Sequence, residues 1–315
     1  MKSNLHLALL FLIPFLSSSQ TPVSKIVYFD SLWKESTEDN YDYYRIIKDY
    51  YSKPDNDLYS IFDYYKSGVL QMEGTSTDKD ALIQEGQFAY YYENGNKKTI
   101  SKFINCRLSG KQFNWYEDGK PKSEIEYLEN QEEVSSDSKI NQYWNAENIQ
   151  TVIDGNGYYE YLEKGFFESG KVKNGFHEGK WKGGSKKPNY TFVENYENRK
   201  LTSGTSIDSS NIEYRYKEVH QRPVPKQGMN HFYSYIGRRM RIPYEAQNTV
   251  FGTIHLTFVI DTDGSLTEIK IIKGLSHALN NEAVRVLKNY KEWSPGSIRG
   301  IPVGVIYSIP ITLGK

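Results

Sequence analysis

The side chains that most often carry out catalysis do not gather into a known pattern in this sequence of 315 residues. None of its histidines belongs to an HExxH motif or to a His/Cys cluster with the spacing of metal ligands. No GxSxG turn presents a nucleophilic serine. The six histidines are His6, His177, His220, His231, His255 and His277. The sequence therefore predicts a protein that is not an enzyme and has no catalytic residues and no metal site.

Two short motifs begin like ligand-binding loops but do not continue as such loops require. Asp261, Asp263 and Gly264 start like a calcium loop, yet the position that needs a bidentate glutamate holds Ile272. Gly155-Asn-Gly157 lacks the rest of a dinucleotide fingerprint. We interpret both motifs as turns and predict no cofactor.

Cys106 is the only cysteine, so no disulfide can form within the chain. It could be a reactive thiol or form a bridge to another molecule. The favoured interpretation is a small residue packed beside a strand.

The clearest candidate for binding is the apolar segment near the end of the chain, from Ile301 to Leu313. Its alternating pattern predicts a strand with one apolar face. If the strand lies at a sheet edge, its free N–H and C=O groups could pair with an incoming peptide. Packing in an ordinary core and pairing in a homodimer remain as alternatives. The candidate partner-binding residues are Val303, Val305, Tyr307, Ile309 and Ile311.

The elements before this strand predict a small α+β module. Residues 253–261 alternate as a strand, Asp263-Gly264 forms a turn, and residues 266–272 return as a second strand. Residues 279–290 repeat their apolar side chains at helical spacing, with Ser276 or Asn280 as the N-cap. Residues 229–239 predict a helix that leads into the module.

The residues of this module resemble the C-terminal domain of TonB-family energy transducers. The family usually has a Met-Pro pair before the tryptophan, where this chain has residues 290–292, which changes a loop. The resemblance implies a domain that binds the N-terminal segment of an outer-membrane transporter by adding it as a strand. The matching motifs are Ile242-Pro243-Tyr244-Glu245-Ala246, Phe258-Val259-Ile260-Asp261, Trp293-Ser294-Pro295-Gly296, Gly300-Ile301-Pro302-Val303 and Ile309-Pro310-Ile311.

A short phrase of aromatic residues followed by a turn repeats through the first half of the chain. Three copies end at glycines that lie 27 and 24 residues apart, at positions 68, 95 and 119. This period predicts stacked β-hairpins. The phrase resembles bacterial MORN-type repeats. Its predicted turn residues are Gly68, Asn94, Gly95, Asp118 and Gly119. A later copy has Arg199 in place of glycine, which predicts a looser turn or one of another type.

Composition and the first residues indicate where the protein acts. The 39 basic and 39 acidic residues balance, so the chain has no basic surface typical of nucleic-acid binding. Lys2, the apolar run of residues 5–16 and Ser17-Ser18-Ser19 form the pattern of a secretory signal. The run is short of the ~20 residues that span a bilayer. An uncleaved anchor is the alternative.

These observations predict a mainly β repeat array followed by an α+β module. We expect a signal peptide at 1–19, the array at 25–215, a linker at 216–228 and the TonB-like module at 229–315. The expected protein is a non-enzymatic envelope protein of the periplasm. Association with the outer membrane without stable insertion is an open alternative. Its partner would be a transporter segment or another envelope protein. The alternative is a periplasmic scaffold, or a homodimer through the final strand, without energy transduction.

Overall fold

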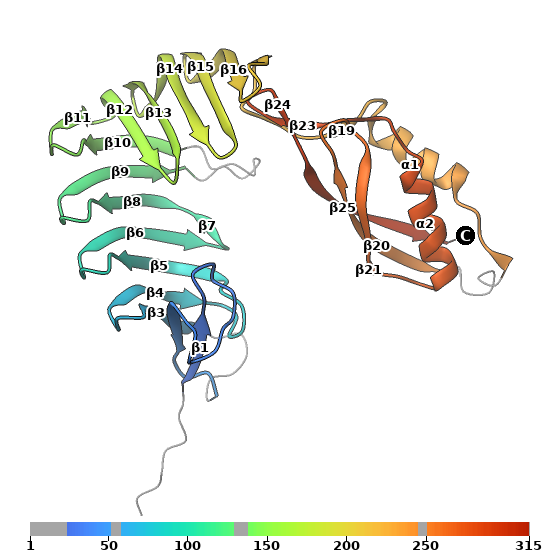
Figure 1. The fold of residues 1–315 in the computed structure, drawn as a ribbon, viewed down its shortest axis with the longest axis horizontal. Helices are drawn as coiled ribbons and strands as arrows, with labels where there is room; N and C mark the ends of the chain where they lie inside the picture. Colours follow the sequence, from blue (N-terminus) through green and yellow to red (C-terminus); the bar gives the residue numbers. More distant parts are fainter. Residues whose placement is uncertain (1–23, 52–57, 129–137, 245–250, 315) are drawn as a thin grey trace, which may run out of the picture. The chain divides into compact units, whose positions relative to one another are not determined.

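The computed structural model describes residues 24–51, 58–128, 138–244 and 251–314, which are mostly strands (Figure 1). The predicted signal peptide lies outside the described residues. The chain forms two compact units, Met1–Gln150 and Thr151–Lys315.

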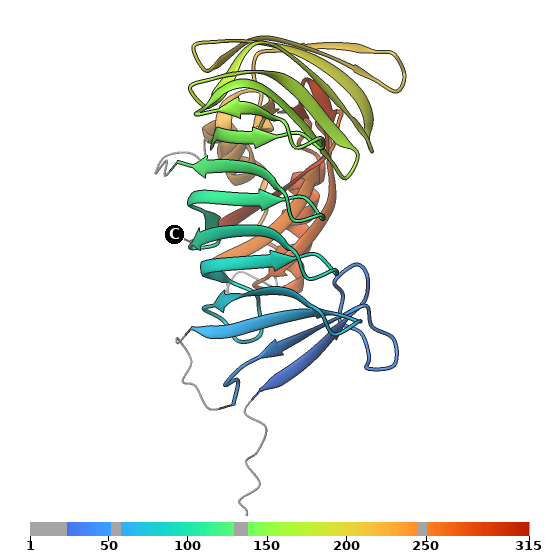
Figure 2. The ribbon, with the colours of Figure 1, turned by 90° about the vertical axis from the view of Figure 1, so that its left-hand side faces the viewer.

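The first unit is a succession of antiparallel strands, which Figure 2 shows one above the next. Neighbouring strands pair directly from β1 to β6, and β8, β9 and β10 continue the sheet. The strands are β1 (Lys25–Phe29), β2 (Tyr43–Ile47), β3 (Tyr59–Tyr65), β4 (Leu70–Ser76), β5 (Gln84–Tyr91), β6 (Lys97–Ile104), β7 (Arg107–Leu108), β8 (Gly110–Trp115), β9 (Pro121–Tyr127) and β10 (Ser138–Trp144). The predicted fold of stacked hairpins is therefore confirmed.

The repeated phrases lie at the hairpin turns of this unit. Gly68, Gly95 and Gly119 all have φ near 85°, a backbone conformation that glycine adopts without steric cost. The Asn94 side chain accepts a hydrogen bond from the Asn96 N–H at 2.9 Å, and Asp118 accepts one from Lys120 at 3.1 Å. Each side chain thus closes the turn two residues ahead of it.

The second unit begins with further hairpins. They are built from β11 (Gln150–Ile153), β12 (Asn156–Glu163), β13 (Phe166–Lys173), β14 (Phe176–Lys186), β15 (Asn189–Glu197), β16 (Lys200–Asp208) and β17 (Glu213–Tyr216). Each strand pairs antiparallel with the next. This part of the second unit, β12–β17, is called the unit-2 sheet below.

The turn at Arg199 is of another type than the turns at Gly68, Gly95 and Gly119, as the missing glycine predicts. Asn198 and Arg199 have φ of 50° and 69°, and Glu197 pairs with Lys200 across a two-residue loop. Asn174 and Gly175 form the same kind of loop, with φ of 53° and 86°. The guanidinium of Arg199 lies 3.7 Å from the centre of the Phe176 ring, and this cation–π contact stabilises the turn.

Several glycines outside the turns make room for aromatic rings on the neighbouring strand. A Cβ added at Gly170 would lie 2.4 Å from the Trp181 ring, and Gly170 pairs directly with Trp181. Gly183 and Gly204 stand in the same relation to Phe192 and Tyr216, respectively. Each ring fills the space that a side chain at the glycine would take, and together the rings give the thin sheet one packed face.

The remaining residues form the C-terminal module, residues 220–314. Its elements are β18 (His220–Gln221), β19 (Val224–Pro225), α1 (Gly228–Arg239), β20 (Gly252–Ile260), β21 (Leu266–Lys273), α2 (His277–Lys288), β22 (Trp293–Ser294), β23 (Gly296–Ile298), β24 (Ile301–Val303) and β25 (Val305–Leu313). The segment predicted as a linker contains β18 and β19, which pair with β23 and β22. Ser276 is the N-cap of α2, and its hydroxyl accepts a hydrogen bond from the Leu279 N–H at 3.3 Å.

The core of the module lies between the helices and one face of the sheet β21–β20–β25. The alternating strand residues Ile254, Leu256, Phe258 and Ile260 are almost fully buried. They pack with buried helix residues such as Phe232. This confirms the predicted α+β arrangement. Among the described residues, neither helix is long and apolar enough to cross a membrane.

Candidate functional site

The final strand of the chain, β25, lies at the edge of its sheet. Its register with β20 runs from Val305 opposite Ile260 to Leu313 opposite Gly252. Among the described residues no strand pairs with its other side, which is called the outer edge below. An outer edge leaves a row of backbone donors and acceptors available for pairing.

The side chains of β25 alternate as its sequence pattern predicts. Ile309 and Ile311 are buried, and Val305 and Tyr307 are partly buried. Ile306 is 75% exposed. Val303 does not belong to this strand, because the chain leaves the strand conformation at Gly304 and Val303 pairs with Gly296 in a separate small sheet. The expected single strand from Ile301 to Leu313 is thus two strands, β24 and β25.

Pro310 indicates which backbone groups face the outer edge. The residues of an antiparallel strand direct their N–H and C=O groups alternately to the two sides. A proline has no N–H, so it fits where its nitrogen faces the unpaired side. Residues of the same parity, Ile306, Ser308 and Thr312, therefore direct their backbone groups outward.

The candidate binding residues consequently have a different role from the one expected. By this alternation the backbone groups of Val305, Tyr307, Ile309 and Ile311 face β20. The side chains of Tyr307, Ile309 and Ile311 pack in or against the core. The residues at the outer edge are their neighbours, which the apolar pattern did not single out. The proline inside the strand is the signal in the sequence that could have identified them.

A cavity of about 540 Å³ adjoins the end of β25, and it is called the edge pocket below. Three of its residues come from α1, Met240 is the C-cap of that helix, and five consecutive residues come from the last strand and the glycine after it. The pocket is lined by Tyr233, Ile236, Gly237, Met240, Ile242, Pro310, Ile311, Thr312, Leu313 and Gly314.

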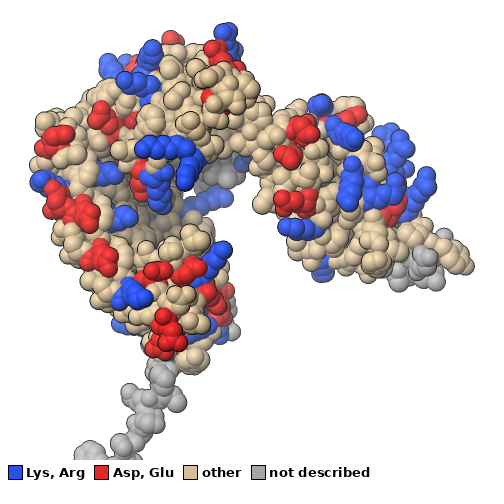
Figure 3. All heavy atoms as spheres, in the orientation of Figure 1, with Lys and Arg blue, Asp and Glu red and all other residues tan. Residues whose placement is uncertain are grey.

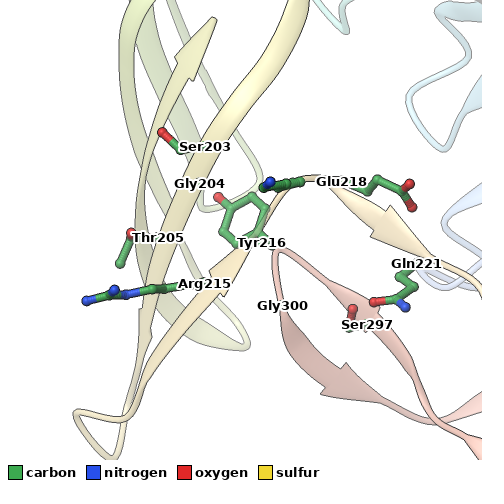
Figure 4. A pocket seen from close by; sticks show the side chains of 10 residues that line it. Ser203, Gly204, Thr205, Arg215, Tyr216, Glu218, Gln221, Ser297 and Gly300 are labelled. Carbon is green, nitrogen blue, oxygen red and sulfur yellow. The ribbon is translucent and has the colours of Figure 1, made fainter.

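A second cavity, of about 710 Å³, lies between the unit-2 sheet and the β23–β24 hairpin (Figure 4). In Figure 4 the Tyr216 ring lies among the labelled residues, with Ser203 and Thr205 on β16 and Ser297 on the β23–β24 hairpin. Most of its lining residues have polar side chains. The lining residues are Ser203, Gly204, Thr205, Arg215, Tyr216, Lys217, Glu218, Gln221, Ser297 and Gly300.

Arg299, at the tip of this hairpin, is buried against the unit-2 sheet and is 8% exposed. Its Nε donates a hydrogen bond to a Glu194 carboxylate oxygen at 2.9 Å, and its Nη2 lies 3.5 Å from a Glu168 oxygen. The guanidinium stacks 3.8 Å from the centre of the Phe192 ring. The Ser206 hydroxyl donates to the Arg299 carbonyl at 2.7 Å. Paired and hydrogen-bonded on several sides, this buried cation holds the hairpin on the sheet.

Burial shifts the protonation of two groups near this arginine. It raises the pKa of Glu168 to about 7, although the charge of Arg299 acts in the opposite direction. It lowers the pKa of His177 to about 4, and the charge of Arg299 adds to that effect. The His177 ring stacks on Trp181 with 3.4 Å between ring centres. The Glu168 and His177 side chains both lie on the unit-2 sheet and are partly buried.

The residues considered for chemistry are dispersed over the structure. No group of three or more His, Cys, Asp or Glu side chains could hold a metal ion in the part of the chain that is described. Asp261 and Asp263 lie at the β20–β21 turn, where the Gly264 N–H donates to the Asp261 carbonyl at 2.9 Å. Cys106 is exposed at a turn with φ of 62°, so the expectation of a packed residue is wrong. Figure 3 shows basic and acidic side chains interspersed over the face in view.

One comparison with known proteins bears on this site. Residues 243–312 match the model of the family "Gram-negative bacterial TonB protein C-terminal". The match covers the sheet β21–β20–β25 and α2, and ends within the last residues of β25. It supports the TonB-like resemblance of the module. No curated protein and no solved structure gave a significant match. The MORN-type resemblance of the hairpins stays a prediction.

Proposed function

We propose that the protein is an exported, non-enzymatic envelope protein whose C-terminal module binds an extended segment of a partner. The segment would add as a fourth strand to the outer edge of β25. The observation that carries this proposal is the unpaired edge strand within a module that matches the TonB C-terminal family. Strand addition takes much of its affinity from main-chain hydrogen bonds, and side-chain pockets supply specificity.

The family match also directs the choice of partner and compartment. In this proposal the protein acts in the periplasm, and its partner is the N-terminal segment of an outer-membrane transporter. In the same proposal residues 25–215 form the repeat array and residues 229–315 bind the partner. Residues 216–228 connect the two and add β18 and β19 to the module. The Arg299 contacts attach the module to the unit-2 sheet. They support the proposal that the hairpins hold the module in place.

The test is calorimetric titration of the full chain with N-terminal transporter segments from the same genome. Proline at Ile306 removes one outward N–H, and alanine at the same position keeps it. We expect Ile306→Pro to weaken binding at least about tenfold, the effect of losing roughly 1.4 kcal/mol, and Ile306→Ala to weaken it much less.

Circular dichroism and thermal unfolding of both variants provide the control for folding. The Ile306 side chain is exposed, so its truncation should leave the core unchanged. Equal affinity of a folded Ile306→Pro variant and the original chain would contradict strand addition at this edge.

A second candidate function is a scaffold that assembles through β25 itself. The exposed Ile306 on an unpaired edge favours it, because two such edges could pair with each other. Analytical ultracentrifugation decides between the two. A stable dimer that Ile306→Pro dissociates, with no transporter segment bound, would favour the scaffold.

A further inference from the structure

The edge pocket lies directly beside the outer edge of β25. Its lining includes five consecutive residues of the chain, from Pro310 to Gly314, and the four of these that belong to β25 point their side chains alternately to both faces of the sheet. No residue of β20 lines it. A cavity that contacts both faces of one strand and avoids the paired neighbour must border the unpaired side of that strand.

The opposite wall of the pocket is the C-terminal half of α1. Ile236 is buried beneath it, whereas Tyr233 is 41% exposed. Gly237 leaves open space, since an added Cβ would have no heavy atom within 4 Å. A strand added at the end of β25 would therefore run between the outer edge and α1.

The alternation of β25 determines which side chains of that strand would enter the pocket. Directly opposite residues of antiparallel strands place their side chains on the same face. Ile311 and Leu313 point toward the helices and pack with the core. Residues of the added strand opposite Ile311 and Leu313 would point their side chains toward α1. The residue between those two would point its side chain to solvent.

Pro310 makes the side-chain contribution important at this end of the strand. It offers the added strand an acceptor and no donor, so the backbone ladder has one hydrogen bond fewer here. Burial of an apolar side chain can compensate for that loss, because it contributes about 1.5–3 kcal/mol for a large aliphatic or aromatic residue.

We propose that the edge pocket is a specificity pocket for a large apolar side chain of the added segment. The occupant is an extended segment of the partner with leucine, isoleucine or phenylalanine at alternate positions and polar residues between them. This inference rests on the proposed strand addition and names the side chain that the same site selects.

The experiment fills the pocket from the protein side. Gly237→Trp places a ring in the open space beside α1, and Gly237→Ala leaves most of that space free. Both changes replace a glycine within a helix, where glycine is unfavourable, so the fold should be retained. The probe is a transporter segment that binds the full chain in the preceding titration, together with its single-alanine variants.

We expect Gly237→Trp to weaken binding of the segment at least tenfold and Gly237→Ala to leave it nearly unchanged. At one apolar position of the segment, substitution by alanine should weaken binding to the original chain by a similar factor. In the Gly237→Trp chain the same alanine change should cause no further loss, because its pocket is already occupied.

The outcomes separate the pocket from the edge. If Ile306→Pro abolishes binding and Gly237→Trp does not affect it, the edge binds the segment and the pocket assignment is overturned. Additive losses from Gly237→Trp and every alanine variant also overturn it. If no segment binds the original chain, or if the pocket proves to be covered by a second copy in a dimer, the strand-addition proposal fails and the pocket assignment with it.

Discussion

At the scale of single residues, burial of charge within the unit-2 sheet is the most consequential feature. Glu194 is fully buried and accepts hydrogen bonds from the Arg299 Nε and from the hydroxyls of Tyr196 and Tyr216. Glu168 has the same arginine near it but only at 3.5 Å. A buried carboxylate with fewer partners keeps its proton to higher pH, which explains its raised pKa.

The pKa of Glu168 predicts how stability depends on pH. Its folded-state pKa of about 7 lies above the ordinary value of 4.5, so the folded state holds the proton more tightly. The stability it contributes is complete below about pH 4.5 and is lost as pH rises through 7. Glu168→Gln should therefore gain stability relative to the original chain between pH 5 and pH 8, by on the order of 3 kcal/mol.

Urea denaturation at these two pH values measures the difference. Glu160→Gln, at an exposed position of β12, is the matched control. His177 acts with the opposite sign, because its lowered pKa gives stability that is lost as pH falls from 6.5 toward 4. Because every variant keeps His177, comparing the variants with the original chain at the same pH cancels the contribution of this histidine. A difference that does not change with pH would contradict the prediction.

At the scale of elements, aromatic rings over glycines determine how neighbouring strands pack. Trp181 is fully buried and its ring occupies the space above Gly170 on the adjacent strand. The indole N–H also donates to the Lys171 carbonyl at 2.9 Å. The glycine is required here by the close approach of the ring.

Gly170→Ala should destabilise the unit-2 sheet by about 1–3 kcal/mol, the usual cost of overpacking a filled site. Thermal or chemical unfolding of the full chain measures it. Ser169→Ala on the same strand is the control. The Trp181→Leu change should reduce the cost of the added methyl, since the ring is what that methyl meets. An unchanged cost in that background would show that the ring is not the cause.

At the scale of the whole molecule, a buried arginine joins the hairpins of the second unit to the C-terminal module. Arg299 belongs to the module by sequence, yet its partners Glu168 and Glu194 lie on β13 and β15. Its N–H donates to the Val219 carbonyl at 2.7 Å. The contact links residues more than 100 positions apart along the chain.

Arg299→Met should destabilise the second unit by about 3–5 kcal/mol, because it leaves buried carboxylates without their cation. Adding Glu194→Gln should recover part of this loss, since the buried charge is then removed with its partner. Arg215→Met, at an exposed arginine of β17, is the control. Chemical denaturation of the full chain measures all three variants, and equal effects of Arg299→Met and Arg215→Met would contradict the anchoring role.

Local pattern was sufficient for most elements of the fold. The period of two in residues 253–261 and 305–313, and the glycines of the repeated turns, reflect steric preferences that act between near neighbours in the chain. These preferences hold wherever the segment lies, so strands, hairpins and the two helices were predictable. The change of turn type at Arg199 was predictable too, whereas the contact of its guanidinium with the Phe176 ring depends on the adjacent hairpin.

The site itself depended on tertiary structure. Sequence alone identified β25 as a candidate for binding, and its motifs identified the TonB-like module. Whether a strand lies at an edge depends on which distant strands pair with it, and Pro310 is the local signal of that edge in β25. The same reason applies to the edge pocket and to Arg299, whose neighbours come from segments far apart in the chain. Local residue order determined the elements, and long-range packing decided which of their backbone groups remain free to bind.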